Sequence, residues 1–259
     1  MSQVFNVKYG HHIASSADFI LHRVLAQNLQ RGSSVHITLI SLEREFAQWR
    51  AIAAKNNIQL STFLQNGNMT YIDGLSISAS SQASSGKSDM GPGYYIAPSI
   101  FQDVDKVTLH YLYTILETTL QSTRTKSHML IFDSPSILEF LGVPSLEITR
   151  FIRAVLSLYR SNSTSSLVLF RGHITSPLTT TTTPFDTPVL RLLVSLAHAH
   201  VEVLSLRTGR SGAVSGEVCV HPGIGDLVNR QGGRRTAIQY KLTDSGVVFF
   251  QKGMSKGVL

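Results

Sequence analysis

Asp133 is the residue that most directly suggests chemistry, because it ends a short apolar run, His128 to Phe132, on a single carboxylate. In α/β proteins that hydrolyse nucleotides, a strand of this kind presents its terminal Asp to a phosphate-bound Mg²⁺ ion. That ion also needs a loop of the form G-x-x-x-x-G-K-[ST], placed between an earlier strand and a helix. Asp133 is therefore a convincing magnesium ligand only if such a phosphate loop exists.

The phosphate loop is missing from the place where it would have to stand. Between a predicted strand at residues 5–9 and a helix that begins near Ala17, the chain lacks the second glycine and the Lys-Ser/Thr pair. A Gly-Lys-Ser triplet occurs at Gly86 to Ser88, but Ser81 stands where the motif needs its first glycine, so we interpret it as a chance match. We expect no ATP cofactor in this chain's own site, and Asp133 is interpreted as a strand-end residue that caps the following turn or helix.

Other catalytic and metal-binding patterns are also missing from the sequence. The histidines do not show the spacing of a zinc site, the pattern G-x-S-x-G does not occur, and Cys219 is the only cysteine. These absences predict a chain without catalytic residues and without a metal. A lone cysteine excludes an intrachain disulfide and fits a reducing compartment such as the cytoplasm. No apolar stretch of about 20 residues and no secretory leader is visible, so we expect no membrane partner.

The chain is basic, with 23 Lys and Arg residues against 16 Asp and Glu residues, a net charge of +7 and a pI near 9.7. Such an excess favours a polyanionic partner such as RNA. The candidate contacts lie on predicted loops, where open α/β folds bind ligands. They are Arg171, His173, Arg207, Arg210, Arg234 and Arg235. The alternative, that they are solvated loop charges, stays open.

Strand-like and helix-like patterns alternate along about the first two hundred residues, which predicts an α/β fold with a mostly parallel central sheet flanked by helices. From about Val201 the chain changes to strands separated by glycine-rich turns, and we expect these to extend one edge of the sheet in antiparallel fashion. The expected strands are 5–9, 35–40, 69–72, 128–132, 167–170, 201–206, 216–221, 237–242 and 246–251, and the expected helices are 17–28, 43–56, 104–121 and 145–159.

The alternation predicts a single domain over residues 1–259. Two segments interrupt it. Residues 76–98 are rich in serine and glycine and are expected to form a surface insertion. Residues 172–188 contain five consecutive threonines between a strand and a helix, and loops of that length are usually functional or disordered.

Four segments, taken in order along the chain, resemble the sixth subunit of the Elongator complex. The most specific is Tyr240 to Leu259, in which Tyr-Lys-Leu-Thr-Asp is followed by Val-Val-Phe-Phe-Gln-Lys-Gly-Met-Ser and a short apolar end. The other three are Ala17 to His22, Met69 to Leu75 and Gly209 to Val220. Together they run through nearly the whole chain, although residues 76–98 and the threonine run differ in composition from what the family leads us to expect.

The resemblance implies a RecA-like fold that has lost its phosphate loop. Members of that family assemble with the fourth and fifth Elongator subunits into a two-by-three heterohexameric ring. That ring binds tRNA, hydrolyses ATP as an assembly, docks on the larger catalytic part of Elongator and supports modification of wobble uridines (U34), which implies work in the cytoplasm and the nucleus. By analogy with RecA-like rings, the segment after Asp133 and the loop from Arg171 to Pro188 would face the central channel.

Three functional hypotheses result. The leading one is a non-catalytic ring subunit that contributes a basic, loop-lined surface to tRNA. The second is an ATPase that uses a degenerate loop at Gly10 to Asp18, with Asp133 as the magnesium ligand. The third is a composite site, in which Arg207 or Arg210 completes the ATP pocket of a neighbouring subunit.

Overall fold

The computed structural model describes residues 3–9, 17–30, 32, 34–74, 93–96, 107–124, 126–162, 165–173, 188–206, 212–223, 237–243 and 246–251. The strands in this part of the chain are β1 (Gln3–Tyr9), β2 (Val35–Ser41), β3 (Met69–Asp73), β4 (Tyr94–Ile96), β5 (Ser127–Asp133), β6 (Ser166–His173), β7 (Ala199–Leu204), β8 (Gly216–Pro222), β9 (Ile238–Thr243) and β10 (Gly246–Gln251). They form one sheet in the order β10-β9-β8-β7-β1-β6-β5-β2-β3-β4.

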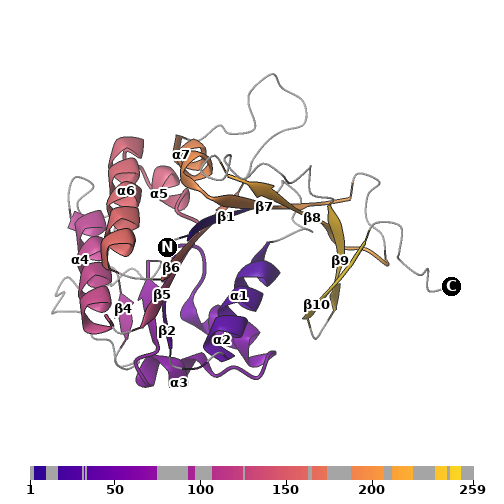
Figure 1. Ribbon diagram of the computed structural model, residues 1–259, viewed down its shortest axis with the longest axis horizontal. Helices are drawn as coiled ribbons and strands as arrows, with labels where there is room; N and C mark the ends of the chain where they lie inside the picture. Colours follow the sequence, from indigo (N-terminus) through magenta and orange to yellow (C-terminus); the bar gives the residue numbers. More distant parts are fainter. Residues whose placement is uncertain are drawn as a thin grey trace.

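The sheet has a parallel body and an antiparallel extension. All neighbours from β7 to β4 pair in parallel, whereas β8, β9 and β10 pair in antiparallel fashion with the strands that precede them. Figure 1 shows the extension curving around until the β9–β10 hairpin faces the same side of the sheet as the N-terminal helices. The predicted α/β class, with a mostly parallel sheet and antiparallel C-terminal edge strands, is confirmed.

Helices cover both faces of the parallel body (Figure 1). They are α1 (Asp18–Gln30), α2 (Phe46–Ala54), α3 (Leu60–Gln65), α4 (Val107–Ser122), α5 (Ile137–Phe140), α6 (Ser145–Asn162) and α7 (Pro188–Leu196). Successive strand residues point to opposite faces, so Leu39 and Ile131 pack with α1 to α3, and Phe132 and Phe170 pack with α4 to α7. A parallel sheet covered on both faces explains why its central strands consist almost entirely of buried residues.

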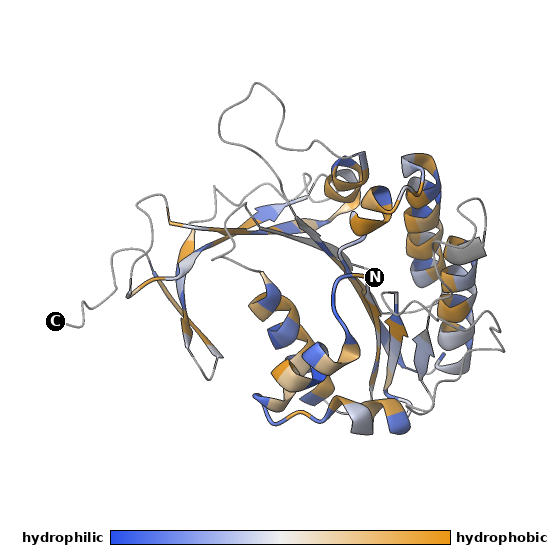
Figure 2. Ribbon diagram, turned by 180° about the vertical axis from the view of Figure 1, so that it is seen from behind, coloured by the Kyte–Doolittle hydropathy of each residue, from blue (hydrophilic) through white to orange (hydrophobic). Residues whose placement is uncertain are grey.

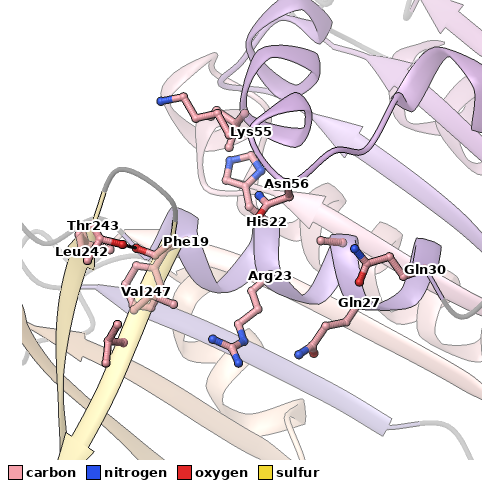
Figure 3. A pocket seen from close by; sticks show the side chains of 14 residues that line it. Phe19, His22, Arg23, Gln27, Gln30, Lys55, Asn56, Leu242, Thr243 and Val247 are labelled. Carbon is pink, nitrogen blue, oxygen red and sulfur yellow. Dashed lines mark hydrogen bonds between the residues drawn. The ribbon is translucent and has the colours of Figure 1, made fainter.

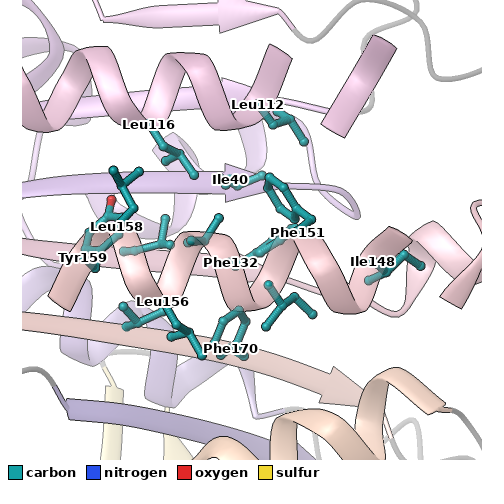
Figure 4. Packing of buried hydrophobic residues seen from close by; sticks show 14 of the residues in the cluster. Ile40, Leu112, Leu116, Phe132, Ile148, Phe151, Leu156, Leu158, Tyr159 and Phe170 are labelled. Atoms are coloured by element: carbon teal, nitrogen blue, oxygen red, sulfur yellow. The ribbon is translucent and has the colours of Figure 1, made fainter. Parts of the chain in front are cut away.

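The helix α6 shows how periodicity builds this core. Ile148, Ile152, Val155 and Tyr159 recur at helical spacing and are fully or almost fully buried. They face the sheet side that carries Phe132 (Figure 4), and burying each such side chain contributes about 1.5–3 kcal/mol. Figure 2 shows blue and orange segments alternating along α1 and α2, as expected for helices with one buried side. Within the described ranges, no helix combines the length and the apolarity needed to cross a bilayer.

The single helix predicted at residues 43–56 is wrong at its N-terminal end. The helix α2 begins only at Phe46, with Glu45 as its N-cap residue. The carbonyl of Arg44 accepts hydrogen bonds from the hydroxyls of Ser41 (2.7 Å) and Tyr71 (2.9 Å). Because these bonds engage the Arg44 carbonyl outside the helix, residues 43 and 44 stay in a connection that crosses the end of β2.

The surface insertion predicted at residues 76–98 is also wrong at its C-terminal end. Tyr94–Ile96 form β4, which pairs in parallel with β3. Tyr94 is buried, its ring stacks on that of Tyr71 with centroids 5.3 Å apart, and its hydroxyl donates a hydrogen bond of 2.7 Å to Asp73 Oδ2. Three residues are too few to show the two-residue period of a strand, so β4 cannot be recognised from its own residues. Residues 75–92, and 174–187 of the threonine-rich loop, lie outside the described residues.

Candidate functional site

Polar side chains form a row across the carboxyl ends of four neighbouring parallel strands. Asp73 of β3 is in register with Ser41 of β2, Ser41 with Asp133 of β5, and Asp133 with Arg171 of β6. Residues in register on parallel strands project to the same face, here the face covered by α1 and α2. This edge of an open α/β sheet is where such folds bind their ligands.

The centre of this row is the guanidinium of Arg171, whose side chain is fully buried. Its Nη1 pairs with Asp18 Oδ1, its Nη2 with Glu43 Oε2, and its Nε with Asp133 Oδ1. Arg171 Nε and Asp133 Oδ1 form a close ionic contact, and neither of these two atoms makes a hydrogen bond. Three carboxylates from three chain segments therefore surround one internal cation.

The rim of the cluster is tied together by further contacts. Asp18, the first residue of α1, also pairs with Arg44, and both side chains are partly exposed, at 20% and 17%. The hydroxyl of Ser134 donates a hydrogen bond of 2.7 Å to Glu43 Oε2. Ser134 has a φ of 55°, a left-handed conformation that costs a non-glycine residue about 1–2 kcal/mol. The turn after β5 therefore holds this hydroxyl inside the cluster at a cost in backbone energy.

The charges of the cluster do not balance when every group is ionised. Two guanidinium groups, those of Arg44 and Arg171, face the three carboxylates of Asp18, Glu43 and Asp133. Burial raises the pKa of Asp133 from its ordinary 3.8 to about 7, against the opposing effect of Arg171. Protonation of Asp133, the innermost carboxyl, makes the cluster neutral.

The carboxyl of Asp133, which would serve a nucleotide's metal ion, is in contact with Arg171. A Mg²⁺ ion would have to replace the guanidinium of Arg171, and a phosphate group would meet the three carboxylates that this guanidinium now binds. Within the described part of the chain, no group of three or more His, Cys, Asp or Glu side chains is arranged to hold a metal. The cluster joins the ends of β5 and β6 to the start of α1.

The structure corrects two roles predicted from the sequence. Arg171 is not available to contact nucleic acid, because its side chain is fully buried among carboxylates. Asp133 does not cap the following turn or helix, since its carboxyl pairs with Arg171 and the N-cap of α5 makes no side-chain hydrogen bond. The backbone of His173 ends β6, and its side chain is not among those described. The other candidates, Arg207, Arg210, Arg234 and Arg235, lie outside the described residues.

Sequence reasoning missed Asp18, Glu43 and Arg44 as members of the site. Asp18 begins α1, and Glu43 and Arg44 lie in the connection after β2. Only the folded sheet brings these residues to Asp133 of β5 and Arg171 of β6. A usable signal existed for Asp133 and Arg171, because each follows an apolar strand and carries a charge into the same edge. Opposite charges at the ends of two adjacent parallel strands predict an ion pair between the two side chains as readily as they predict two contacts to a ligand.

Comparison with known proteins gives one consistent family. The family model described as Elongation complex protein 6 matches residues 11–244. Elongator complex protein 6 of Xenopus laevis is 26% identical over 252 residues, covering 95% of this chain and 89% of the relative. The Danio rerio protein of that name is 26% identical over 257 residues, with coverage of 95% and 89%. The Rattus norvegicus protein is 23% identical over 253 residues, with coverage of 95% and 90%.

A solved structure with a similar fold is that of an uncharacterized protein from Pyrococcus horikoshii, determined in complex with an unknown peptide. The two folds superpose with a TM-score of 0.61 at 10% sequence identity, covering 97% of this chain and 92% of the other. At this identity the likeness concerns the fold alone. Together with the strand order, it agrees with the RecA-like α/β fold expected from the sequence.

Replacing Arg171 with Met should destabilise the protein by about 3–5 kcal/mol, because three carboxylates lose their shared cation. Chemical denaturation monitored by circular dichroism measures this. The exposed Arg153 on α6, changed to Met, is the control and should shift stability by about 0.5 kcal/mol at most. If R171M does not fold, adding Asp133→Asn should restore part of the loss. A cost within about 1 kcal/mol would show that the cluster does not hold the strand ends together.

The raised pKa of Asp133 predicts a definite sign of pH dependence. Between pH 3.8 and about pH 7 the folded protein keeps the Asp133 proton that the unfolded chain releases. The stability that protonated Asp133 contributes is therefore complete below its ordinary pKa of 3.8, and it is lost as pH rises through its pKa of about 7 in the folded protein. Relative to Asp133→Asn, the wild-type free energy of unfolding should fall with rising pH by up to about 1.4 kcal/mol per pH unit. A rise would mean that the charge of Arg171 outweighs burial.

Proposed function

We propose, since the chain belongs to the Elongation complex protein 6 family, that it serves the Elongator complex as a non-catalytic subunit of a heterohexameric ring. In this proposal the ring contains two copies each of this chain and of the fourth and fifth Elongator subunits, and it rests on the larger catalytic part of the complex. The ring binds tRNA and supports modification of the wobble uridine, in the cytoplasm and the nucleus.

One observation carries the non-catalytic part of the proposal. Arg171 occupies the edge of the sheet where a RecA-like fold would hold phosphate and metal, and it is bound by the protein's own carboxylates. Asp133, which would otherwise serve a magnesium ion, is its fully buried partner. With its ligand site filled by a side chain, the chain would use this fold as a structural part of the ring. ATP is therefore not expected as a cofactor in this chain's own site, although the ring would hydrolyse it as an assembly.

The assembly part of the proposal is supported by where apolar side chains remain exposed. Four of the large hydrophobic residues exposed in the described part of the chain lie on the β9–β10 hairpin, and the other two lie near the start of α6. They are Ile238 (45%), Leu242 (40%), Val248 (55%), Phe249 (39%), Phe140 (76%) and Leu146 (59%). Clustered apolar exposure on a soluble domain is typical of interaction surfaces. The net charge of +7 supports an RNA partner for the assembly.

Co-expression with the fourth and fifth Elongator subunits, followed by native mass spectrometry, tests the assembly. We expect a single species with two copies of each chain, and removing any one chain should abolish it. A chain that stays monomeric in the presence of both partners would contradict the proposal.

The RNA part is tested by changing Arg234→Gln and Arg235→Gln together in the assembled ring. This variant should weaken tRNA binding and reduce the slope of log affinity against log salt concentration by about 0.7–0.9 per lost phosphate contact. An unchanged salt dependence would remove these two arginines from the RNA surface.

A further inference from the structure

A groove of about 530 Å³ lies between α1, α2 and the β9–β10 hairpin. Figure 3 shows Phe19 of α1 and Val247 of β10 side by side where the helix meets the hairpin, with Arg23 and Lys55 along the α-helical side of the groove. Its apolar lining comes from both walls and includes Phe19 of α1 and Leu242 of the hairpin. The groove lies on the same side of the sheet as the ion cluster but is formed by different residues.

The hairpin wall of the groove is held in place by aromatic contacts with α1. The ring of Phe19 packs against fully buried Tyr240 of β9, with centroids 4.6 Å apart, and lies 6.3 Å from that of Phe249 in β10. The guanidinium carbon of Arg23 lies over the Phe249 ring, 5.4 Å from its centroid. These contacts fix the hairpin against the helix, so the groove exists before any partner binds and a ligand need not order it.

The strand β10 ends the sheet and has a composition that edge strands normally avoid. It reads Gly-Val-Val-Phe-Phe-Gln, without a charge or a proline, and Val248 and Phe249 are 55% and 39% exposed. Proteins protect such edges with charges, prolines or covering elements, because an open edge recruits another strand. In the described part of the chain β10 pairs only with β9. The sheet curves toward α1 and α2 on this side (Figure 1), so an added strand would lie over the groove.

The charges around the groove select the kind of strand. Among the described residues that line the groove, the charged ones are Arg23 and Lys55, both of which are exposed, and none is a carboxylate. A second copy of this chain would bring a net charge of +7 and an equally uncharged β10 toward these cations, which disfavours self-pairing. A segment with acidic side chains would complement both Arg23 and Lys55.

We propose that this groove and the free edge of β10 bind an extended acidic segment of a partner protein, which adds a strand to the sheet. Main-chain hydrogen bonds to β10 would provide affinity. The face of the added strand that points at the groove would carry both apolar side chains, which enter it, and carboxylates, which reach Arg23 and Lys55. The inference rests on the proposed function for its premise that the chain works in an assembly, and it specifies the chemistry of one partner segment.

Two labelled peptides test the proposal by fluorescence anisotropy with the purified full chain. In one, every second residue is glutamate, valine or phenylalanine, so that these side chains share one face of the strand, and threonine stands between them; the other carries lysine in place of each glutamate. The acidic peptide should bind about tenfold more tightly, since only it complements the groove. Lys55→Glu should weaken its binding about fivefold, whereas Arg153→Glu, the same charge change at an exposed site of α6, should alter it by less than about twofold. Hydrogen exchange of the amides in residues 246–251 should slow when the acidic peptide is bound.

Several results would overturn this inference. They are binding of neither peptide, equal binding of both, an equal effect of the two charge reversals, unchanged exchange in β10, or dimerisation of the isolated chain through this strand. The native mass of the ring assembled with the wild-type chain separates the two proposals. If wild type assembles and the peptide results are negative, the groove proposal fails alone. If the wild-type chain does not assemble, the proposed function fails.

Discussion

The guanidinium of Arg171 is the group on which the carboxyl-terminal edge of the sheet depends. It is fully buried, and it is bound by Asp18 at the start of α1, by Glu43 in the connection after β2 and by Asp133 at the end of β5. A buried guanidinium without partners costs several kcal/mol. Burial of Arg171 therefore favours the arrangement that brings Asp18, Glu43 and Asp133 to β6, and the hydroxyl at the strained turn of Ser134 binds Glu43 in the same cluster.

These contacts also lie at the edge of the sheet where open α/β folds bind their ligands. In a nucleotide-binding relative of such a fold, a lysine from the phosphate loop neutralises phosphate, and a strand-end Asp serves magnesium. Here the cation comes from β6 and neutralises the protein's own carboxylates, one of which is that strand-end Asp. The β9–β10 hairpin, remote from the cluster in sequence, carries four of the six large hydrophobic side chains that are exposed in the described part of the chain.

Much of the fold could be predicted because hydrophobic periodicity is local. The runs at Val35–Ser41 and Ser127–Asp133 show their strands directly, and the spacing in α6 shows its buried side. Two features could not be predicted, since tertiary contacts decide them. The start of α2 is delayed by hydrogen bonds to the Arg44 carbonyl, and β4 exists through its pairing with β3 and the burial of Tyr94. In the site, Asp133 and Arg171 were recognised separately, but their pairing required the strand order, which places β5 next to β6.

Calorimetric titration of Mg²⁺-ATP into the purified chain, without its partners, tests most directly whether Arg171 has replaced the ligand of this site. We predict no saturable heat up to about 1 mM nucleotide, because the cation site is filled by a side chain that is covalently part of the protein. The same titration with Asp133→Asn should look identical. Saturable binding at micromolar ATP that disappears in Asp133→Asn would show that Asp133 still serves a metal ion, and it would contradict the interpretation of this chain as a scaffold.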